Sequence, residues 1–421
     1  MYIDRIDVEN FKSFETLTVK LGNFNVVIGP NASGKSNFVR IFEFLRDIMN
    51  FGLNNAISLQ GGVEYLRNMK IGASKNLTMK IVSLQVRHWI RFGLFHYLEG
   101  NVELETTKTT YEFALNFSKG GYEIAKDELS QTIKFFKTNK GRKREELRRE
   151  LIGEGELVIH RSNGELNVDL NMPENVPLRK EDIIENFLPS FLREEKLPDN
   201  VLLLEIPHIR FLSPFEEILR SIAIYDFDPK LPKKAIPITG KAELEEDGQN
   251  LSIILKNILE DEEKSRKLFN LVKELLPFVE NLGVERFVDK SLLFKLQENY
   301  FGEYIPASLV SDGTISIIAL VIALYFEKKQ LVIIEEPERN IHPYLISKIV
   351  NMMKDASKKK QIIVTTHNPE FVKHAGLENI LLVARNENGF SKITRPLDRE
   401  EVRMFLKNDI GIDELYVQNL L

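Results

Sequence analysis

The feature that most constrains the fold is a glycine-rich segment near the N-terminus that matches Gly-x-x-x-x-Gly-Lys-Ser. It follows the apolar stretch 24–28 and precedes a helical pattern in which Phe38, Ile41, Leu45 and Ile48 share one face. A strand, a glycine-rich turn and a helix in this order cradle phosphate, because backbone N–H groups point inward and the helix N-terminus is partially positive. The predicted nucleotide-binding residues are Gly29, Pro30, Asn31, Ala32, Ser33, Gly34, Lys35, Ser36 and Asn37.

Two side chains of this segment have distinct predicted roles. Lys35 is expected to reach the β- and γ-phosphates of ATP, and the Ser36 hydroxyl is expected to ligate Mg²⁺. The alternative is a chance glycine-rich turn, and the flanking strand and helix argue against it.

An acidic pair follows a second apolar stretch, residues 331–334. Glu335 is expected to hold the hydration shell of Mg²⁺, and Glu336 is expected to polarise the attacking water as a general base. An acidic turn after a core strand is common by itself. The acidic pair therefore indicates a catalytic site only in combination with the glycine-rich loop elsewhere in the same chain.

Two more polar motifs lie at the ends of predicted elements. His367 follows the apolar stretch 361–365, one strand and one helix after Glu336, where it could sense the γ-phosphate; the alternative is an ordinary surface or core histidine. Ser311 and Gly313 open an apolar helix, which is the composition of an anion site but equally of an ordinary N-cap.

The organisation of the chain follows from its periodicity. Alternating apolar and polar residues predict antiparallel strands at 1–21, 111–117, 122–127, 157–161 and 166–170. Helical patterns follow at 180–188, 251–259 and 264–276, separated by prolines too frequent for a long coiled coil. The last third alternates helices at 313–326 and 343–357 with strands at 331–334, 361–365 and 380–384, which favours parallel strands with helical crossovers.

These patterns predict an α/β fold: a P-loop core with a parallel sheet, an antiparallel β lobe and an inserted, mainly helical lid. The predicted head comprises residues 1–171 and 286–421, and the predicted lid comprises residues 172–285.

Composition excludes several classes of chemistry. The 421 residues include no cysteine, which rules out disulfides, thiolate metal sites and a cysteine nucleophile and fits a reducing, cytoplasmic setting. The net charge of −5 gives no general argument for a nucleic-acid or membrane surface. The apolar run 315–326 is shorter than the roughly 20 residues of a membrane span, and the charged N-terminus is unlike a secretion signal.

A local basic stretch leaves two interpretations open. Its basic residues are Lys134, Lys137, Lys140, Arg142, Lys143, Arg144, Arg148 and Arg149. Such a cluster can contact nucleic-acid phosphates. Glu145, Glu146 and Glu150 interrupt it at helical spacing, so we favour a solvated helix with internal salt bridges.

The order of the motifs resembles the ABC-type ATPase heads of the SMC, RecF and OLD families. The sequence looks closest to their stand-alone relatives called AAA family ATPases, which lack a Toprim domain. The residues that carry the resemblance are 10–14, 29–37, 60–62, 247–251, 310–314, 335–343 and 365–369. One departure is Glu335, where most of these relatives have an aspartate, and the extra methylene weakens the argument for its metal role.

The resemblance implies roles that the residues alone do not. Ser311 and Gly313 would form a signature motif that reaches the γ-phosphate held by a second subunit, so catalysis would need an ATP-dependent homodimer or higher oligomer. Asn340 and His342 would form the D-loop between the two sites, and His367 would be the switch histidine.

The resemblance also implies a biological setting. It makes DNA an expected partner and predicts an ATP-hydrolysing protein that regulates phage defence or DNA repair with a protein effector in trans. The alternative is a slow nucleotide-gated scaffold that sequesters a toxin or effector. Gln60 is a candidate for the glutamine of the Q-loop, and Gln85 competes with it.

Overall fold

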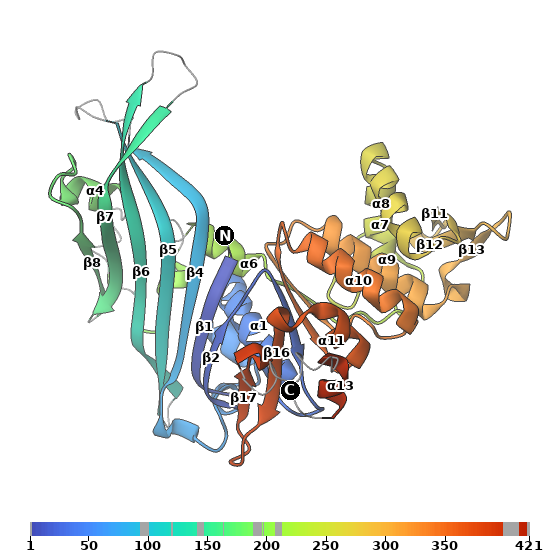
Figure 1. The fold of residues 1–421 in the computed structure, drawn as a ribbon, viewed down its shortest axis with the longest axis horizontal. Coiled ribbons are helices and arrows are strands. Elements are labelled where there is room, and N and C mark those ends of the chain that lie inside the picture. Colours follow the sequence, from blue (N-terminus) through green and yellow to red (C-terminus); the bar gives the residue numbers. More distant parts are fainter. Residues whose placement is uncertain are drawn as a thin grey trace. The chain divides into compact units, whose positions relative to one another are not determined.

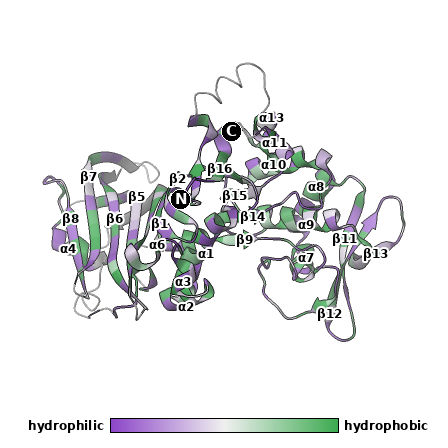
Figure 2. Ribbon diagram, turned by 90° about the horizontal axis from the view of Figure 1, so that it is seen from below, coloured by the Kyte–Doolittle hydropathy of each residue, from purple (hydrophilic) through white to green (hydrophobic). Residues whose placement is uncertain are grey.

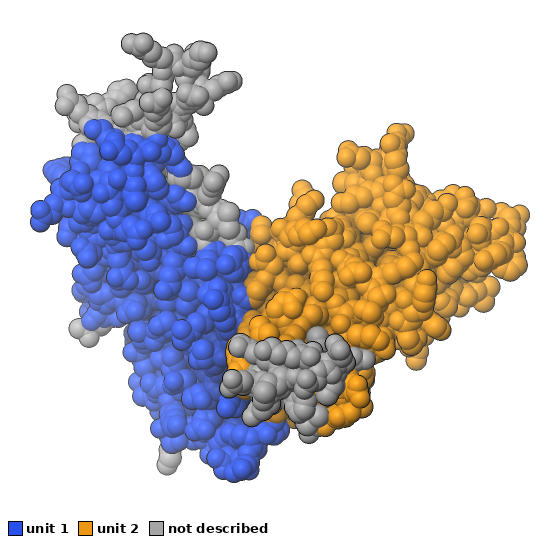
Figure 3. Space-filling model, in the orientation of Figure 1, with its two compact units in different colours: residues 1–21, 40–220, 385–392 blue, residues 22–39, 221–384, 393–421 orange. Residues whose placement is uncertain are grey.

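The structure is a computed structural model, and it divides into two compact units (Figure 3). The residues it describes are 2–92, 101–118, 121–140, 147–162, 164–187, 196, 198–206, 213–398 and 412–418. The first unit comprises Met1–Leu21, Arg40–Arg220 and Arg385–Lys392, and the second comprises Gly22–Val39, Ser221–Ala384 and Ile393–Leu421. The predicted lid, 172–285, contributes residues to both units, and its division from the head stays a prediction.

The first unit is built on a seven-stranded sheet in the order β2-β1-β4-β5-β6-β7-β8 (Figure 1). Its strands are β1 (Tyr2–Phe11), β2 (Phe14–Lys20), β4 (Leu77–Phe92), β5 (Asn101–Ser118), β6 (Gly121–Lys140), β7 (Leu147–Ser162) and β8 (Glu165–Asn171). Every neighbouring pair is antiparallel. Hydrophobic and hydrophilic residues alternate along these strands in Figure 2, which suits a sheet with one buried face. The predicted antiparallel β lobe is confirmed.

The first unit also contains short helices. They are α2 (Leu53–Leu59), α3 (Val63–Leu66), α4 (Lys180–Phe187) and α6 (Ser213–Arg220), with 3-10 turns at Gly72–Ser74 and Leu203–Glu205. The longer α1 (Lys35–Phe51) begins in the second unit and continues into the first. Phe11, Phe42, Phe44 and Tyr111 are fully buried in the first unit, and the rings of Phe11 and Phe44 lie 6.1 Å apart.

The basic stretch is not the helix that its spacing predicted. The residues on either side of 141–146 belong to β6 and β7, so the predicted helix is wrong. Lys134 pairs with Glu154, its direct cross-strand neighbour, at 3.2 Å, and Arg149 lies 2.6 Å from Glu103. Cross-strand pairing therefore supplies the ion pairs that helical spacing suggested. Arg142, Lys143 and Arg144 lie outside the described residues, as do the side chains of Lys140 and Arg148.

A buried carboxyl group fastens a loop to the sheet of the first unit. Asp127, on β6, is 2% exposed; it accepts hydrogen bonds from the Tyr111 hydroxyl at 2.6 Å and from the backbone N–H of Leu203 at 2.8 Å. Burial raises the pKa of Asp127 to about 7, although these hydrogen bonds and the charge of Arg161 act in the opposite direction.

We expect Asp127 to make the stability of the protein depend on pH. The folded protein keeps the Asp127 proton up to about pH 7, whereas the unfolded chain releases it near its ordinary pKa of 3.8. The free energy of unfolding should therefore fall as pH rises from about 4 to 7, by up to about 4 kcal/mol from this group. Urea unfolding of the wild type and of Asp127→Asn at several pH values measures the free energy of unfolding of each. The difference between the two free energies should change with pH, and a difference that is the same at every pH would contradict the assignment.

The second unit contains the parallel sheet that the alternating pattern predicted. Its strands β16-β3-β15-β14-β9 are all parallel, and the short β17 (Ser391–Thr394) follows β16 at the edge of the sheet. Their bounds are β3 (Phe24–Ile28), β9 (Ala223–Tyr225), β14 (Leu331–Glu335), β15 (Gln361–Thr366) and β16 (Ile380–Arg385). The strand β9 was not predicted, because its three residues lie among prolines in the range taken for the lid.

A small antiparallel sheet and several helices complete the second unit. The sheet has the order β10-β12-β11, with β13 paired to β12. Its strands are β10 (Ile236–Pro237), β11 (Val279–Arg286), β12 (Ser291–Glu298) and β13 (Tyr304–Pro306). The helices are α7 (Leu251–Leu259), α8 (Glu262–Leu275), α9 (Asp312–Tyr325), α10 (Pro343–Ala356), α11 (Pro369–Ala375) and α13 (Ile412–Val417), with 3-10 turns at Ala307–Leu309, Leu377–Asn379 and Pro396–Asp398. In the described part of the chain no helix is both long and apolar enough to cross a membrane.

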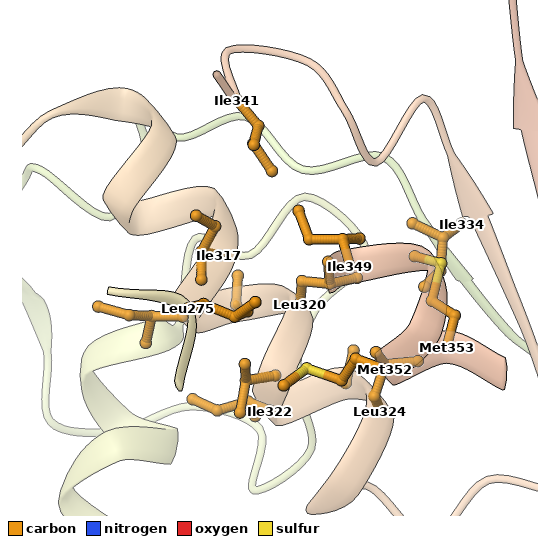
Figure 4. Packing of buried hydrophobic residues seen from close by; sticks show 14 of the residues in the cluster. Leu275, Ile317, Leu320, Ile322, Leu324, Ile334, Ile341, Ile349, Met352 and Met353 are labelled. Atoms are coloured by element: carbon orange, nitrogen blue, oxygen red, sulfur yellow. The ribbon is translucent and has the colours of Figure 1, made fainter. Parts of the chain in front are cut away.

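The core of the second unit forms around α9, which is buried on all sides. Every residue from Thr314 to Leu324 is buried, as expected for a helix that is hydrophobic all round. Figure 4 shows Ile317 and Leu320 of α9 close to Leu275 of α8 and to Ile349 of α10. Burial of such side chains contributes about 1.5–3 kcal/mol each. This packing fixes the strands whose ends carry the site.

Candidate active site

The site residues lie at the carboxyl ends of neighbouring parallel strands in the second unit. Glu335 at the end of β14 is in register with Thr365 of β15, and Thr366 is in register with Ile28 of β3. Gly29, Glu336 and His367 directly follow β3, β14 and β15, respectively. Because parallel strands end at the same edge of a sheet, residues far apart in the sequence meet there.

The glycine-rich loop has the tight backbone that a phosphate cradle needs. A Cβ atom at Gly29 would lie 2.2 Å from the carbonyl oxygen of Val383, so only glycine fits. Ala32 has φ 59° and Gly34 has φ 119°, both in the region that favours glycine. The helix α1 begins at Lys35, so its free N–H groups face the loop.

Lys35 and the acidic pair are electrostatically linked. The Lys35 ammonium donates hydrogen bonds to the carbonyl oxygens of Gly29 at 2.7 Å and Pro30 at 3.1 Å. Burial lowers the pKa of Lys35, and the negative charges of Glu336 and Glu335 act in the opposite direction. The lysine and both carboxylates therefore share one electrostatic environment.

The two predicted magnesium ligands lie together. The Ser36 hydroxyl is 3.5 Å from Oε2 of Glu335, although these residues are separated by most of the chain. Both supply hard oxygen donors, which Mg²⁺ prefers, and Mg²⁺ commonly takes its other ligands from water and phosphate. Among the described residues no group of three or more histidine or acidic side chains could hold a metal alone. The donor set therefore fits a magnesium ion that arrives with a nucleotide.

Glu336 is held from both sides in a strained backbone conformation. Its φ of 44° is unusual for a residue other than glycine and is typical of functional sites. Its Oε1 lies 2.9 Å from Nδ1 of His367, and its Oε2 accepts a hydrogen bond from Arg339 at 3.1 Å. Burial alone would raise the pKa of Glu336, but Arg339 and His367 outweigh it and lower this pKa. Glu336 is therefore a carboxylate at neutral pH.

Two residues that the sequence analysis missed support this arrangement. Glu338, which is 8% exposed, accepts a hydrogen bond from the Thr366 hydroxyl, and burial raises its pKa. The same hydroxyl accepts a hydrogen bond from the backbone N–H of Asn368 at 2.9 Å. Glu338 thus fixes the turn that carries His367. Its place two residues after Glu336 was a signal that could have found it.

Ser311 and Gly313 form the predicted N-terminus of α9. The Ser311 hydroxyl accepts a hydrogen bond from the backbone N–H of Thr314 at 3.2 Å, so it is a helix N-cap. A Cβ atom at Gly313 would lie 2.5 Å from the carbonyl oxygen of Asn340, so the predicted signature motif and D-loop touch. In the part of the chain that the structure describes, neither Ser311 nor Gly313 forms a hydrogen bond with the glycine-rich loop.

The other predicted residues have mainly structural contacts. His342 is the N-cap of α10, where Nδ1 accepts a hydrogen bond from the N–H of Tyr344 at 3.3 Å. Gln60 is buried in the first unit and donates to Glu43 at 3.1 Å. The side chain of Gln85 lies outside the described residues, so the choice of the Q-loop glutamine stays a prediction.

Fold and site together define a P-loop ATPase-type domain, and the comparisons give its family. Residues 101–373 match the family model described as "AAA domain, putative AbiEii toxin, Type IV TA system", and residues 1–154 match a model described as "AAA ATPase domain". The first match covers more than half of the chain, and the chain belongs to this AAA domain family. The predicted α/β P-loop fold and the predicted resemblance to an ATPase head are confirmed.

Two curated relatives match parts of the chain. Septu protein PtuA from Bacillus mycoides is 29% identical over 146 residues, which are 32% of this chain and 20% of PtuA. Endonuclease GajA from Bacillus cereus is 40% identical over 58 residues, 13% of this chain and 10% of GajA. The chain thus spans a fifth of the first and a tenth of the second.

The solved structures to which the chain is similar include SMC head domains. The head bound to the C-winged helix domain of ScpA is 13% identical with a TM-score of 0.49, and the match covers 94% of this chain and 98% of that one. The head from Thermotoga maritima is 15% identical with a TM-score of 0.38, over 94% and 99% of the two chains.

Proposed function

We propose that this protein binds ATP with Mg²⁺ and hydrolyses it to ADP and phosphate. The observation that carries the proposal is the meeting of Lys35, Ser36 and the acidic pair at one edge of the parallel sheet, with Ser36 and Glu335 3.5 Å apart. Membership of an AAA domain family supports nucleotide use.

The chemistry divides among the residues of this edge. The N–H groups of the glycine-rich loop and Lys35 bind the phosphates, and Ser36 and Glu335 would hold Mg²⁺, which neutralises phosphate charge when bound. Glu336 accepts the proton of the water that attacks the γ-phosphorus, as the bond from that phosphorus to the β–γ bridging oxygen breaks. His367, bound to Glu336, orients this carboxylate.

We further propose that two copies pair on ATP, with Ser311 and Gly313 of one copy reaching the nucleotide of the other. Support comes from the exposure of Ser311 and from the closeness of Gly313 to Asn340 of the predicted D-loop. The setting that fits the named relatives is phage defence or DNA repair, with a protein effector in trans and DNA as a further partner. GajA, one of these relatives, is named an endonuclease.

A second function has one observation in its favour. Oε2 of Glu336 accepts a hydrogen bond from the Arg339 guanidinium, which lowers the pKa of this carboxylate and with it its basicity, and so favours slow turnover. A slow nucleotide-gated scaffold that sequesters a toxin or effector fits this feature. Turnover measured with and without DNA separates the two: strong stimulation by DNA favours the first function, and a slow rate that DNA leaves unchanged favours the scaffold.

Lys35→Ala tests the nucleotide site directly. The variant loses a charge-assisted contact to two phosphates, so we expect ATP affinity to fall by about 10- to 100-fold or more. Titration with a fluorescent ATP analogue measures it. Lys256→Ala, a partly exposed lysine of α7, is the matched control and should bind as the wild type does. Equal affinities of Lys35→Ala and the wild type would contradict the assignment of the loop.

A further inference from the structure

A chain of ion pairs links the end of β9 to Glu336. Arg339 donates one hydrogen bond to Asp226 at 2.9 Å and a second one to Glu336 at 3.1 Å. The guanidinium thus bridges two carboxylates. Neither the glycine-rich loop nor the acidic pair by itself indicates a role for Asp226, which lies far from Glu336 in the sequence.

The fold places both anchors of this bridge independently. Asp226 directly follows β9, whose Tyr225 is in register with Ile334 of β14. Arg339 is held by a turn in which its backbone N–H donates to the carbonyl oxygen of Glu336 at 3.0 Å. The end of the neighbouring strand therefore fixes the far side of the guanidinium, and the turn fixes its near side.

We propose that Arg339 is a positioning residue for Glu336 and that Asp226 anchors it. The inference rests on the proposed function of Glu336 as the general base. The Glu336 side chain is 28% exposed, and without restraint it would populate several rotamers. Arg339 holds Oε2 and still leaves lone pairs of the carboxylate for a water molecule, because an ionised carboxylate accepts about four hydrogen bonds.

Arg339 is suited to this role in a way that His367 is not. The guanidinium is charged at every accessible pH, whereas a hydrogen bond from Nδ1 of His367 depends on its tautomer and protonation. Arg339 is itself 47% exposed, so its side chain would be mobile without Asp226. Exposed ion pairs contribute little to stability, so the benefit of this bridge lies in geometry.

Crystal structures and kinetics of four variants test the proposal: Arg339→Ala, Arg339→Lys, Asp226→Ala and the double variant Arg339→Ala/Asp226→Ala. In Arg339→Ala we expect the Glu336 carboxylate to leave its position even without nucleotide, and kcat to fall by about 10- to 100-fold with KM for ATP nearly unchanged. Asp226→Ala should lower kcat less, and the double variant should be no worse than Arg339→Ala, since both act through one bridge.

Two further readouts separate positioning from a merely structural role. Arg339→Lys should recover part of the rate, and melting temperatures should stay close to that of the wild type. Arg266→Ala, an exposed arginine of α8, is the control and should behave as the wild type.

The outcomes distinguish this inference from the proposed function. An unmoved Glu336 carboxylate in crystals of Arg339→Ala overturns the inference, whatever the rate. Unchanged kcat in Arg339→Ala, with hydrolysis lost in Glu336→Gln, overturns the inference and leaves the proposed function intact. Normal hydrolysis by Glu336→Gln removes the general base and the inference with it.

Discussion

Glu336→Gln should abolish ATP hydrolysis and leave ATP binding intact. The amide cannot accept the proton of the attacking water, and general-base catalysis typically contributes about 10²- to 10⁴-fold, so we expect kcat to fall by that factor. The amide has the shape of the carboxylate, and the loop N–H groups and Lys35, which we propose to bind the phosphates, are unchanged in this variant. ATP should therefore bind as in the wild type, and ATP-dependent dimers should persist because the nucleotide is not consumed.

Phosphate release and size-exclusion chromatography with ATP measure the two effects. Glu274→Gln, an exposed position of α8, is the matched control and should hydrolyse ATP at the wild-type rate. If Glu336→Gln turned over ATP normally, Glu336 would not be the base. If it failed to bind ATP, the loss of turnover would have another cause.

Ser311→Arg should prevent the ATP-dependent dimer and with it most of the hydrolysis. Ser311 is exposed at the start of α9, where we propose that it reaches the nucleotide bound by the second copy. A long cationic side chain at this position would leave no room for the second copy and its nucleotide. Because the proposed active site is completed by the partner, we expect turnover to fall by about 100-fold. ATP binding to the single copy should remain.

Analytical ultracentrifugation in the presence of ATP measures the dimer. Both the protein with Ser311 and the Ser311→Arg variant carry Glu336→Gln, so that ATP is not consumed. Ser311→Arg also removes an N-cap, which costs about 1 kcal/mol, so its melting temperature must be compared with that of the wild type. Ser162→Arg, at an exposed end of β7, introduces the same side chain elsewhere and should leave the dimer unchanged. A dimer that persists in a folded Ser311→Arg variant would remove the proposed role of the signature motif.

Local patterns predicted much of the second unit. The strand β3 and the helix α7 have the predicted bounds, and the predicted helix at 313–326 corresponds to α9 within one residue at each end. Such elements depend on apolar periodicity and caps between near neighbours, which a sequence displays directly. The prediction for the basic stretch was wrong because oppositely charged residues also pair across neighbouring strands, as Lys134 and Glu154 do.

The sequence by itself determined the chemical groups: the glycines that allow the loop, Lys35 and Ser36 at its end, and Glu335 and Glu336 after a buried strand. Only the tertiary structure decided which distant groups meet them. The pairing of β9 with β14 brings Asp226 to Arg339, and the packing of α9 brings Gly313 to Asn340. Spacing in a sequence records neighbours a few residues apart, whereas the order of parallel strands is fixed by burial of the whole sheet, and no local pattern encodes it.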